Sequence, residues 1–422
     1  MRFLYSILMY LLTPFILIRL WWKGKSLPAY RERIAERFGL AKQPKRPIDV
    51  WLHAVSLGEV IAAIPLIEAM LAKSWAVLVT TMTPTGSTRV FTHFGDQVSH
   101  QYIPYDLPLI LRRFFKDWQP AVGVIMETEL WPNLIYEAKA AQVPLLLANA
   151  RLSNRSHKGY MRLRFLFKSL LKQFSAILTQ SSDDASRFIA LGAPVSAVHV
   201  LGNMKFDVKT QAITHEIVQK IKENWGTGRT VVIAASTHEG EEEAILLQWK
   251  RIQEAIPGVL LLIAPRHPER FVTVFKLCAQ LGFDSGLRSE IDTISADNEV
   301  IVLDSLGELL AWYQISQYAF VGGSLVSLGG HNVLEPIAVK TPVFSGNQVA
   351  NFKAICQDLQ EAEAIRLVAD ARELIEAIIQ MHQDEASRKQ IIANATEVLE
   401  RNRGAVSKHM DYIEKILASS KA

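Results

Sequence analysis

Short apolar runs of strand length alternate with helix-length stretches along most of this chain, and this alternation limits the fold more than any other feature. The runs of the first half lie at residues 48–54, 75–81, 121–127, 143–149 and 175–180, and those of the second half at 230–236, 259–265, 299–304, 318–323 and 341–346. The stretches between the runs of the first half include 57–72, 84–94, 131–142 and 153–173. Apolar strands that alternate with helices indicate βαβ units, in which helices cover both faces of a parallel sheet. The sequence therefore predicts an α/β protein.

The alternation stops in the region of residues 203–228, which predicts a boundary between two Rossmann-like domains. With 422 residues, of which 49% are apolar and 21% charged, the chain is large enough for two such domains and unlike a disordered chain. We expect the first domain at residues 48–205, a linker at 206–228 and the second domain at 229–387. In such folds ligands bind at the carboxyl ends of the parallel strands, so a site is expected there.

The first residues of the chain have the composition of a membrane anchor. Residues 3–22 contain one charge, Arg19, and 20 such residues span about 30 Å as a helix, which is roughly one hydrocarbon core. We therefore expect an anchor at residues 1–22 followed by a basic juxtamembrane segment at 23–47, with the body of the protein on the cytoplasmic side. A cleaved signal peptide fits less well, because its positive charge should precede the apolar run. Pro14 and Arg19 leave open a helix that lies in the interface instead of spanning it.

Cysteine usage and net charge exclude several classes of protein. The two cysteines, Cys278 and Cys356, are far apart, which excludes a disulfide scaffold and a cysteine zinc site. A net charge of +4 is too small to indicate a nucleic-acid partner. No second apolar run is long enough to span a membrane, which excludes a transporter.

A glycine-rich segment, VGGSLVSLGGHNVLEP at residues 321–336, follows an apolar run in the second half. Its glycines permit positive φ and a close approach of the backbone to a ligand. We expect His331 and Asn332 to open a helix whose free N–H groups and dipole suit a phosphate, and Glu335 to accept hydrogen bonds from ribose hydroxyls. The alternative is a glycine-rich turn between strand and helix that binds no ligand.

Two further strand ends in the second half carry polar residues. One run ends at Pro265, Arg266 and His267, and the guanidinium of Arg266 suits a phosphate. Another run is followed by Leu306, Gly307 and Glu308. A solvated loop arginine and an ordinary helix cap are the alternatives, but three polar loops at one sheet edge favour a binding site.

The first half offers carboxylates at its strand ends. Glu59 lies in a glycine-containing turn from strand to helix, where desolvation would raise its pKa into the range of a general base. The alternative is a glutamate that only initiates a helix. Glu127 and Glu129 follow another run, and an extended backbone would place both on one face. His53 is interpreted as a structural histidine.

Residues 151–172 are predicted to form a basic helix with interleaved apolar side chains and no acidic residue. Such a helix suits an anionic lipid surface or a phosphorylated acceptor, although a solvated helix face is the alternative. The basic residues expected to make this contact are Arg151, Arg155, Arg162, Arg164 and Lys168.

Assembled in order, these motifs closely resemble the 3-deoxy-D-manno-octulosonic acid (Kdo) transferases of lipopolysaccharide biosynthesis. The resembling segments are HAVSLGE (53–59), METELWPN (126–133), NARLSNRS (149–156), GNMKFD (202–207), PRHPERF (265–271), DSLGEL (304–309) and VGGSLVSLGGHNVLEP (321–336). The resemblance implies a GT-B glycosyltransferase fold, two Rossmann-like domains facing a cleft, with the acceptor bound by the first and the CMP-sugar by the second. It also implies that residues 388–422 form a helix that crosses back to the N-terminal domain.

The resemblance further implies the reaction: transfer of Kdo from CMP-Kdo to the lipid A precursor (lipid IVA) at the inner membrane, with inversion by a single displacement. Glu59 matches the family's general base, and Glu129 and Lys205 match positions assigned to transition-state stabilisation. The CMP-binding positions are Pro265, Arg266, Leu306, Gly307, Glu308, Asn332, Val333, Leu334 and Glu335. No metal, other cofactor, nucleic acid or obligate protein partner is expected.

Two other functions remain as alternatives at this point. A GT-B transferase that uses a UDP-sugar and a lipid-linked acceptor would share the fold and the membrane location. A membrane-anchored nucleotide-binding scaffold would bind CMP without turnover.

Overall fold

The structure is a computed structural model that describes residues 2–26, 28–40, 47–207 and 228–421. The chain divides into two compact units, which are called here the N-terminal unit (residues 1–207 and 402–422) and the C-terminal unit (residues 208–401). Most of the linker predicted at 206–228, and residues 27 and 41–46 of the basic juxtamembrane segment, lie outside the described residues.

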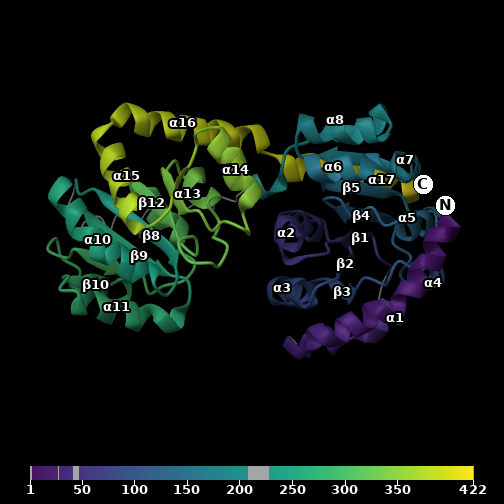
Figure 1. The fold of residues 1–422 in the computed structure, drawn as a ribbon, viewed down its shortest axis with the longest axis horizontal. Coiled ribbons are helices and arrows are strands. Elements are labelled where there is room, and N and C mark those ends of the chain that lie inside the picture. Colours follow the sequence, from purple (N-terminus) through teal and green to yellow (C-terminus); the bar gives the residue numbers. More distant parts are fainter. Residues whose placement is uncertain (1, 27, 41–46, 208–227, 422) are drawn as a thin grey trace. The chain divides into compact units, whose positions relative to one another are not determined.

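The N-terminal unit is built on a seven-stranded parallel sheet in the order β3-β2-β1-β4-β5-β6-β7. The strands are β1 (Val50–His53), β2 (Val77–Thr81), β3 (Ser99–Tyr102), β4 (Val122–Met126), β5 (Leu145–Ala150), β6 (Phe174–Thr179) and β7 (Val198–Val200). The helices are α1 (Arg2–Ser26), α2 (Leu57–Ala72), α3 (Pro84–Phe94), α4 (Pro108–Trp118), α5 (Pro132–Ala140), α6 (Asn154–Met161), α7 (Arg164–Leu171), α8 (Ser182–Leu191) and α17 (Ala405–Lys421). Figure 1 shows helices on both faces of this sheet.

Alternation along the strands divides the N-terminal core into two clusters, one on each face of the sheet. In β1, Val50 and Leu52 pack with residues of α2 and α17, whereas Trp51 packs on the opposite face with residues of α4 and α5. Successive side chains of a strand point to opposite faces, so a strand covered on both sides must be apolar throughout.

The C-terminal unit repeats this architecture with the strand order β10-β11-β9-β8-β12-β13-β14, again all parallel. Its strands are β8 (Val231–Thr237), β9 (Leu260–Pro265), β10 (Ser285–Leu287), β11 (Val300–Val302), β12 (Tyr318–Val321), β13 (Val343–Gly346) and β14 (Arg366–Val368). Its helices are α10 (Glu241–Ala255), α11 (Phe271–Gln280), α12 (Leu309–Ile315), α13 (Leu334–Ala338), α14 (Lys353–Glu361), α15 (Ala371–Gln383) and α16 (Glu385–Asn402). The predicted pair of Rossmann-like domains is thus confirmed.

Each of the ten predicted runs contains a strand, but four strands were not predicted: β3, β7, β10 and β14. All four lie at the edges of their sheets. Their residues are partly exposed, whereas the residues of β1, β2, β4 and β12 are buried throughout. An edge strand has a sheet neighbour on one side only, so it needs no long apolar run and leaves a weak signal in the sequence.

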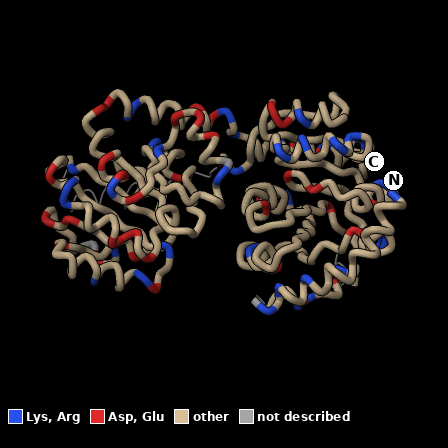
Figure 2. Tube along the Cα trace, in the orientation of Figure 1, with Lys and Arg blue, Asp and Glu red and all other residues tan. Residues whose placement is uncertain are grey.

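The single basic helix predicted over residues 151–172 is wrong, because the structure has two helices there. Helix α6 ends at Met161 and α7 begins at Arg164, with Leu163 outside the helical region at φ −118° and ψ 32°. Helix α6 packs on α8, whereas α7 packs on both α5 and α8, so the two segments follow different neighbours. Figure 2 shows Lys and Arg residues recurring along this region.

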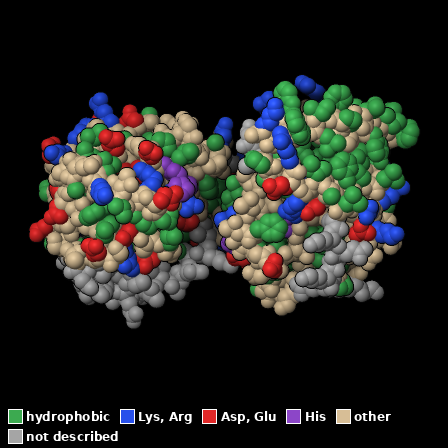
Figure 3. All heavy atoms as spheres, turned by 90° about the horizontal axis from the view of Figure 1, so that it is seen from below, with side chains coloured by type: hydrophobic (Ala, Val, Ile, Leu, Met, Phe, Trp, Pro, Cys, Tyr) green, Lys and Arg blue, Asp and Glu red, His purple; other side chains and the backbone are tan. Residues whose placement is uncertain are grey.

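Helix α1 lies on the surface of the N-terminal unit and keeps its apolar side chains exposed. It is long and apolar enough to cross a membrane, by length and composition. Phe3, Leu11 and Phe15 are 75%, 65% and 68% exposed, and hydrophobic side chains gather over one face of this unit (Figure 3). The first turn of α1 nevertheless has polar partners in the same unit. Tyr5 donates a hydrogen bond to Asp106 (2.8 Å), Ser6 donates one to Asn133 (2.9 Å), and Arg2 forms an ion pair with Glu137.

Helix α17 packs against α2 and β4 of the N-terminal unit and is fixed at its start by Asp207. The Asp207 carboxylate accepts hydrogen bonds from the N–H groups of Gly404 and Val406, each at 2.7 Å. A carboxylate at a helix start satisfies N–H groups that have no partner within the helix, so the end of the chain is held firmly beside residues 202–207.

Candidate active site

Glu59 lies in the first turn of α2, directly beyond the carboxyl end of β1. Ser56 caps this helix, and its hydroxyl accepts a hydrogen bond from the Glu59 N–H at 3.4 Å. The Glu59 carboxylate in turn accepts hydrogen bonds from the Val55 N–H (2.8 Å) and from the Ser56 hydroxyl (3.0 Å). This reciprocal arrangement is a capping box, which fixes the carboxylate while leaving it only 8% exposed.

The surroundings of Glu59 are those of a general base. Burial, followed by the negative charges of Glu129 and Glu127, raises its pKa from 4.5 to about 8, while the hydrogen bonds from Val55 and Ser56 act in the opposite direction. A carboxyl with this pKa accepts a proton far more readily than an ordinary glutamate, yet is still largely ionised in mildly alkaline solution.

Glu127 and Glu129 follow β4, but the segment between them is not extended, which corrects the reasoning that placed them on one face. β4 ends at Met126, and Glu127 has a φ of 54°, in the left-handed region. The Glu129 carboxylate accepts a hydrogen bond from the indole N–H of Trp131 at 2.7 Å, and burial raises its pKa. Glu127 instead pairs with Lys205, with 3.3 Å between its Oε1 and the lysine Nζ. The structure thus places Glu59, Glu127, Glu129 and Lys205 at one sheet edge.

Lys205 is held by backbone hydrogen bonds that join three distant segments. Its N–H donates to the Asn203 side chain (3.0 Å), and the next N–H back, that of Met204, donates to the Asn149 side chain (3.1 Å). Asn149 has a φ of 50°, and its own N–H donates to Nε2 of the buried His409 in α17 at 3.0 Å. The sequence identified Lys205 but gave no sign of His409, because that contact joins residues 260 positions apart.

His53 is fully buried, and its Nδ1 bonds to Thr80 at 2.9 Å. Burial lowers its pKa to about 4, so its imidazole is neutral near pH 7. Its ring lies edge-on to that of Trp131 at 5.5 Å.

The predicted CMP-binding residues of the C-terminal unit lie at or beyond the carboxyl ends of its strands. Pro265 ends β9, and the side chain of Arg266 after it is exposed. Glu308 forms a two-pronged ion pair with Arg288 (2.7 and 2.8 Å), beside the exposed Leu306 and next to Gly307. This pairing fixes the 304–308 loop.

The segment 332–335 forms a compact corner before α13. The Asn332 side chain donates to Glu335 and accepts from the Leu334 N–H, both at 3.1 Å, and burial raises the pKa of Glu335. Val333 and Leu334 are 1% exposed, so they pack in the core. The helix begins at Leu334, two residues later than Asn332, where it was predicted to open. It is also only five residues long, so the expected phosphate site at its start is not supported.

The first N–H groups of the glycine-rich segment are bound by a carboxylate of the protein itself, which the sequence analysis did not identify. Glu241, 1% exposed at the start of α10, accepts hydrogen bonds from the N–H groups of Gly323, Ser324 and Leu325 (2.7–3.0 Å) and of His238 (2.9 Å). These N–H groups are therefore occupied and not free for a phosphate. The run of three glutamates at 241–243 was the feature of the sequence that could have indicated this carboxylate.

The five basic residues predicted to contact the acceptor or the membrane, Arg151, Arg155, Arg162, Arg164 and Lys168, are all exposed. Arg151 lies near Glu127 and Glu129, because its carbonyl accepts a hydrogen bond from the hydroxyl of Thr128, which lies between them. Arg164 donates to the carbonyl of Ala190 at 3.0 Å, which connects α7 to α8.

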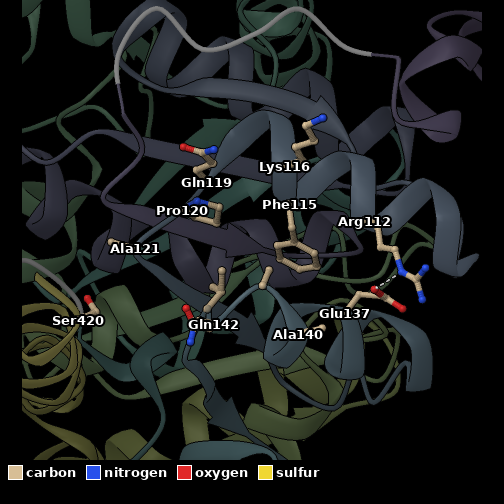
Figure 4. A pocket seen from close by; sticks show the side chains of 12 residues that line it. Arg112, Phe115, Lys116, Gln119, Pro120, Ala121, Glu137, Ala140, Gln142 and Ser420 are labelled. Atoms are coloured by element: carbon tan, nitrogen blue, oxygen red, sulfur yellow. Dashed lines mark hydrogen bonds and ion pairs between the residues drawn. The ribbon is translucent and has the colours of Figure 1, made fainter.

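A cavity of about 600 Å³ lies at the opposite edge of the N-terminal sheet. Arg112 and Glu137 form an ion pair on one side of it, and Gln142 and Ser420 lie on the other (Figure 4). Its wall includes Ala121 and Val143, which precede β4 and β5, so it is far from the carboxyl ends that carry Glu59. Among the described residues, no group of three or more His, Cys, Asp or Glu side chains has the arrangement of a metal site.

The family model and the curated relatives agree on one family. Residues 32–208 match the family model described as 3-deoxy-D-manno-octulosonic-acid transferase (kdotransferase). The chain is 38% identical over 422 residues to the 3-deoxy-D-manno-octulosonic acid transferase of Haemophilus influenzae, covering 99% of each chain. It is 33% identical over 428 residues to the protein of that name from Bordetella pertussis, covering 98% of this chain and 99% of the other. The crystal structure of a glycosyltransferase from Rickettsia africae ESF-5 shares the fold, with a TM-score of 0.52 at 14% identity over 88% of this chain and 99% of that one.

Proposed function

Because the chain belongs to the family of the Kdo transferases, and is therefore a glycosyltransferase of lipopolysaccharide biosynthesis, we propose that it moves Kdo from CMP-Kdo to the lipid A precursor, lipid IVA. The proposal includes inversion at the anomeric carbon in a single displacement that needs no metal or other cofactor. The observation that carries it is the buried Glu59, fixed by its capping box and raised in pKa to about 8 by burial and two neighbouring carboxylates.

Glu59 acts as the general base in this proposal. It takes the proton from an acceptor hydroxyl while that oxygen forms a bond to the anomeric carbon of Kdo. The bond from that carbon to the phosphate oxygen breaks, and CMP leaves with the electron pair. A base whose pKa lies near the pH of the surrounding solution suits this proton transfer, and a single displacement requires no covalent glycosyl-enzyme.

Glu129 and Lys205 stabilise the transition state. The Trp131 indole holds the Glu129 carboxylate, which suits it to balance the positive charge that develops on the sugar ring. The ammonium of Lys205, oriented by Glu127, neutralises the carboxylate of the sugar acid or the phosphate of the donor. Both roles come from the family resemblance. The geometry supports them, because Trp131 fixes the carboxylate of Glu129 and Glu127 fixes the ammonium of Lys205.

The CMP portion of the donor binds to the C-terminal unit in this proposal. Arg266 contacts the phosphate, Glu335 accepts hydrogen bonds from the ribose, and the corners at 306–308 and 332–334 enclose the nucleoside. CMP carries one phosphate, so its departure develops less charge than that of a nucleoside diphosphate, and cationic side chains suffice to stabilise it.

We also propose that α1 attaches the enzyme to the cytoplasmic face of the inner membrane by lying in the interface rather than crossing the bilayer. Its first turn is bonded to Asp106, Asn133 and Glu137, and the segment after it returns to the same unit through Arg33 and His100 (3.0 Å). A spanning helix would carry its first turn to the far side of the membrane, away from these partners. Exposed apolar side chains along α1 and basic residues on α6 and α7 suit an anionic lipid surface.

Labelling of an introduced cysteine separates the two topologies. In Leu4→Cys, a maleimide that cannot cross membranes should react only after spheroplasts are permeabilised, as it should in the control Ser420→Cys. Cys278 and Cys356 are buried, so the background is low. Reaction of Leu4→Cys in intact spheroplasts would show that α1 spans the membrane.

One assay tests the proposed reaction. Purified protein in detergent receives the tetraacylated lipid A precursor and CMP-Kdo generated in place, with EDTA present, and the lipid is weighed by mass spectrometry. A gain of one or more Kdo masses is expected. Absence of both a lipid product and CMP release would favour a UDP-sugar donor, whereas CMP release without lipid product would contradict the acceptor.

A further inference from the structure

Two histidines of the C-terminal unit are hydrogen-bonded to each other at the carboxyl edge of its sheet. His238 directly follows β8, and His331 follows the glycine-rich segment after β12. Their Nε2 atoms are 2.8 Å apart, and their rings are nearly parallel, with an interplanar angle of 5°. The ring of His267 lies edge-on to that of His238 at 5.3 Å. Figure 3 shows histidine side chains together at the surface of this unit.

The positions of these histidines suit them to bind an anion. His267 follows Arg266, which comes directly after β9, so imidazole and guanidinium groups from three strand ends gather at one edge. Both His238 and His331 are half-buried, and in the described part of the chain neither Nδ1 makes a hydrogen bond. The N–H groups of Gly323, Ser324 and Leu325 already bind Glu241, so these three donors are not available to an anion.

The contact between the two Nε2 atoms has a simple consequence for protons. In a neutral pair, one histidine donates its Nε2 hydrogen, and the other accepts it and carries its own hydrogen on Nδ1. Only one of the two Nδ1 atoms is then a donor. One added proton gives both rings an Nδ1 hydrogen and gives the pair a charge of +1.

We propose that His238 and His331 form a proton-sharing pair that takes up one proton from solution when the phosphate of the CMP portion binds, and that the resulting cation then holds the departing phosphate. This inference rests on the proposed function, because it assumes that CMP is the nucleotide of the donor. The pair gains a charge of +1, the proton stays on it during transfer, and its positive charge stabilises the negative charge that develops on CMP.

The charged groups around the pair keep it neutral until an anion arrives. Burial, together with the neighbouring His238, Arg266 and His267, lowers the pKa of His331 to about 4. Burial also lowers the pKa of His238; Glu241 and Glu242 act against this shift, and His267 and Arg270 add to it. A bound phosphate adds negative charge at the pair and raises its proton affinity.

Calorimetry of CMP binding measures this proton directly. Full-length protein in detergent is titrated with CMP at pH 7 in PIPES, HEPES and Tris buffers, whose ionisation enthalpies differ. The slope of the observed enthalpy against the buffer enthalpy gives the number of protons taken up. We expect about one for the natural protein and near zero for His331→Gln and His238→Gln, with CMP affinity about tenfold weaker in both variants. The exposed His382→Gln in α15 is the matched control and should behave as the natural protein.

The natural protein alone provides a second test that does not depend on the folding of any variant. Its CMP association constant should fall about tenfold per pH unit in the range above the free pKa of the pair and below the bound one. CMP binding with no proton uptake, or uptake unchanged in both glutamine variants, would overturn the proton-sharing pair and leave the proposed function standing. Binding of UDP in place of CMP would overturn the proposed function itself.

Discussion

Glu59 and Glu241 lie at corresponding places in the two units, but their carboxylates have different hydrogen-bond partners and different neighbouring charges. Each lies in the first turn of the helix that follows the first strand of its unit, and both are nearly buried, at 8% and 1% exposed. Glu241 accepts hydrogen bonds from four backbone N–H groups. Glu59 accepts one backbone N–H and one hydroxyl and faces the charges of Glu127 and Glu129.

This difference shows how one fold position produces two roles. Four N–H donors use up the acceptor capacity of the Glu241 carboxylate, so Glu241 has a structural role in holding the turn after β12. Few donors and nearby negative charges leave Glu59 with a raised pKa and spare acceptor capacity, which are the properties of a base. Carboxylates thus gather at the carboxyl edge of the sheet in the N-terminal unit. At the carboxyl edge of the sheet in the C-terminal unit, Arg266 and histidines are suited to bind an anion.

The largest expected effect is on catalysis at Glu59. Glu59→Gln keeps the size and the hydrogen bond from the Val55 N–H but removes the base, so kcat should fall about 1,000-fold or more. CMP binding measured by calorimetry should stay within about twofold, because the proposed CMP site lies in the other unit. Residual transfer above a tenth of the natural rate would remove Glu59 from the role of base.

Glu241→Gln should damage stability instead of chemistry. A glutamine amide presents donors to N–H groups that need an acceptor, and hydrogen bonds to a charged group contribute about 1.5–3 kcal/mol each, so the loss should be about 3 kcal/mol. Chemical denaturation measures it, with the exposed Glu243→Gln on the same helix as the control. Equal stability of the two variants would contradict the structural role of Glu241.

The same exchange at Glu59 should raise stability, and the effect should depend on pH. A carboxyl whose pKa rises from 4.5 to about 8 on folding contributes stability that is present below pH 4.5 and lost as pH rises toward 8. Glu59→Gln should therefore gain about 4 kcal/mol at pH 8 and nothing near pH 4. Thermal unfolding at the two pH values measures the gain in stability. A gain independent of pH would show that folding does not raise the pKa of Glu59.

The smallest expected effect concerns the neighbour of the base. At saturating CMP-Kdo, the kcat/KM of the natural enzyme for the acceptor should rise about tenfold per pH unit below pH 8 and then level off. Glu129→Gln removes a negative charge beside Glu59, so the inflection should move to lower pH by about half a unit, whatever the height of the plateau. An inflection that stays in place would mean that the charge of Glu129 does not contribute to the pKa of Glu59.

The interior of both sheets could be predicted from the sequence, because a strand covered on two faces must be apolar along its length. The edge strands β3, β7, β10 and β14 could not, since their partly exposed residues leave no continuous apolar run. The break between α6 and α7 could not be predicted either, because it depends on the helices that each of the two packs against.

The sequence by itself determined what acts within a few residues: the interior strands, the apolar helix at the start and the capping box of Ser56 and Glu59. Only the tertiary structure decided the partners that meet at the strand ends. Lys205 and Glu127 are 78 residues apart, Glu241 and Gly323 are 82 apart, and His238 and His331 are 93 apart. A capping box is closed by neighbours along the chain, whereas these contacts exist only because parallel strands bring their carboxyl ends to one edge. The different surroundings of Glu59 and Glu241, on which their proposed roles depend, follow from that assembly.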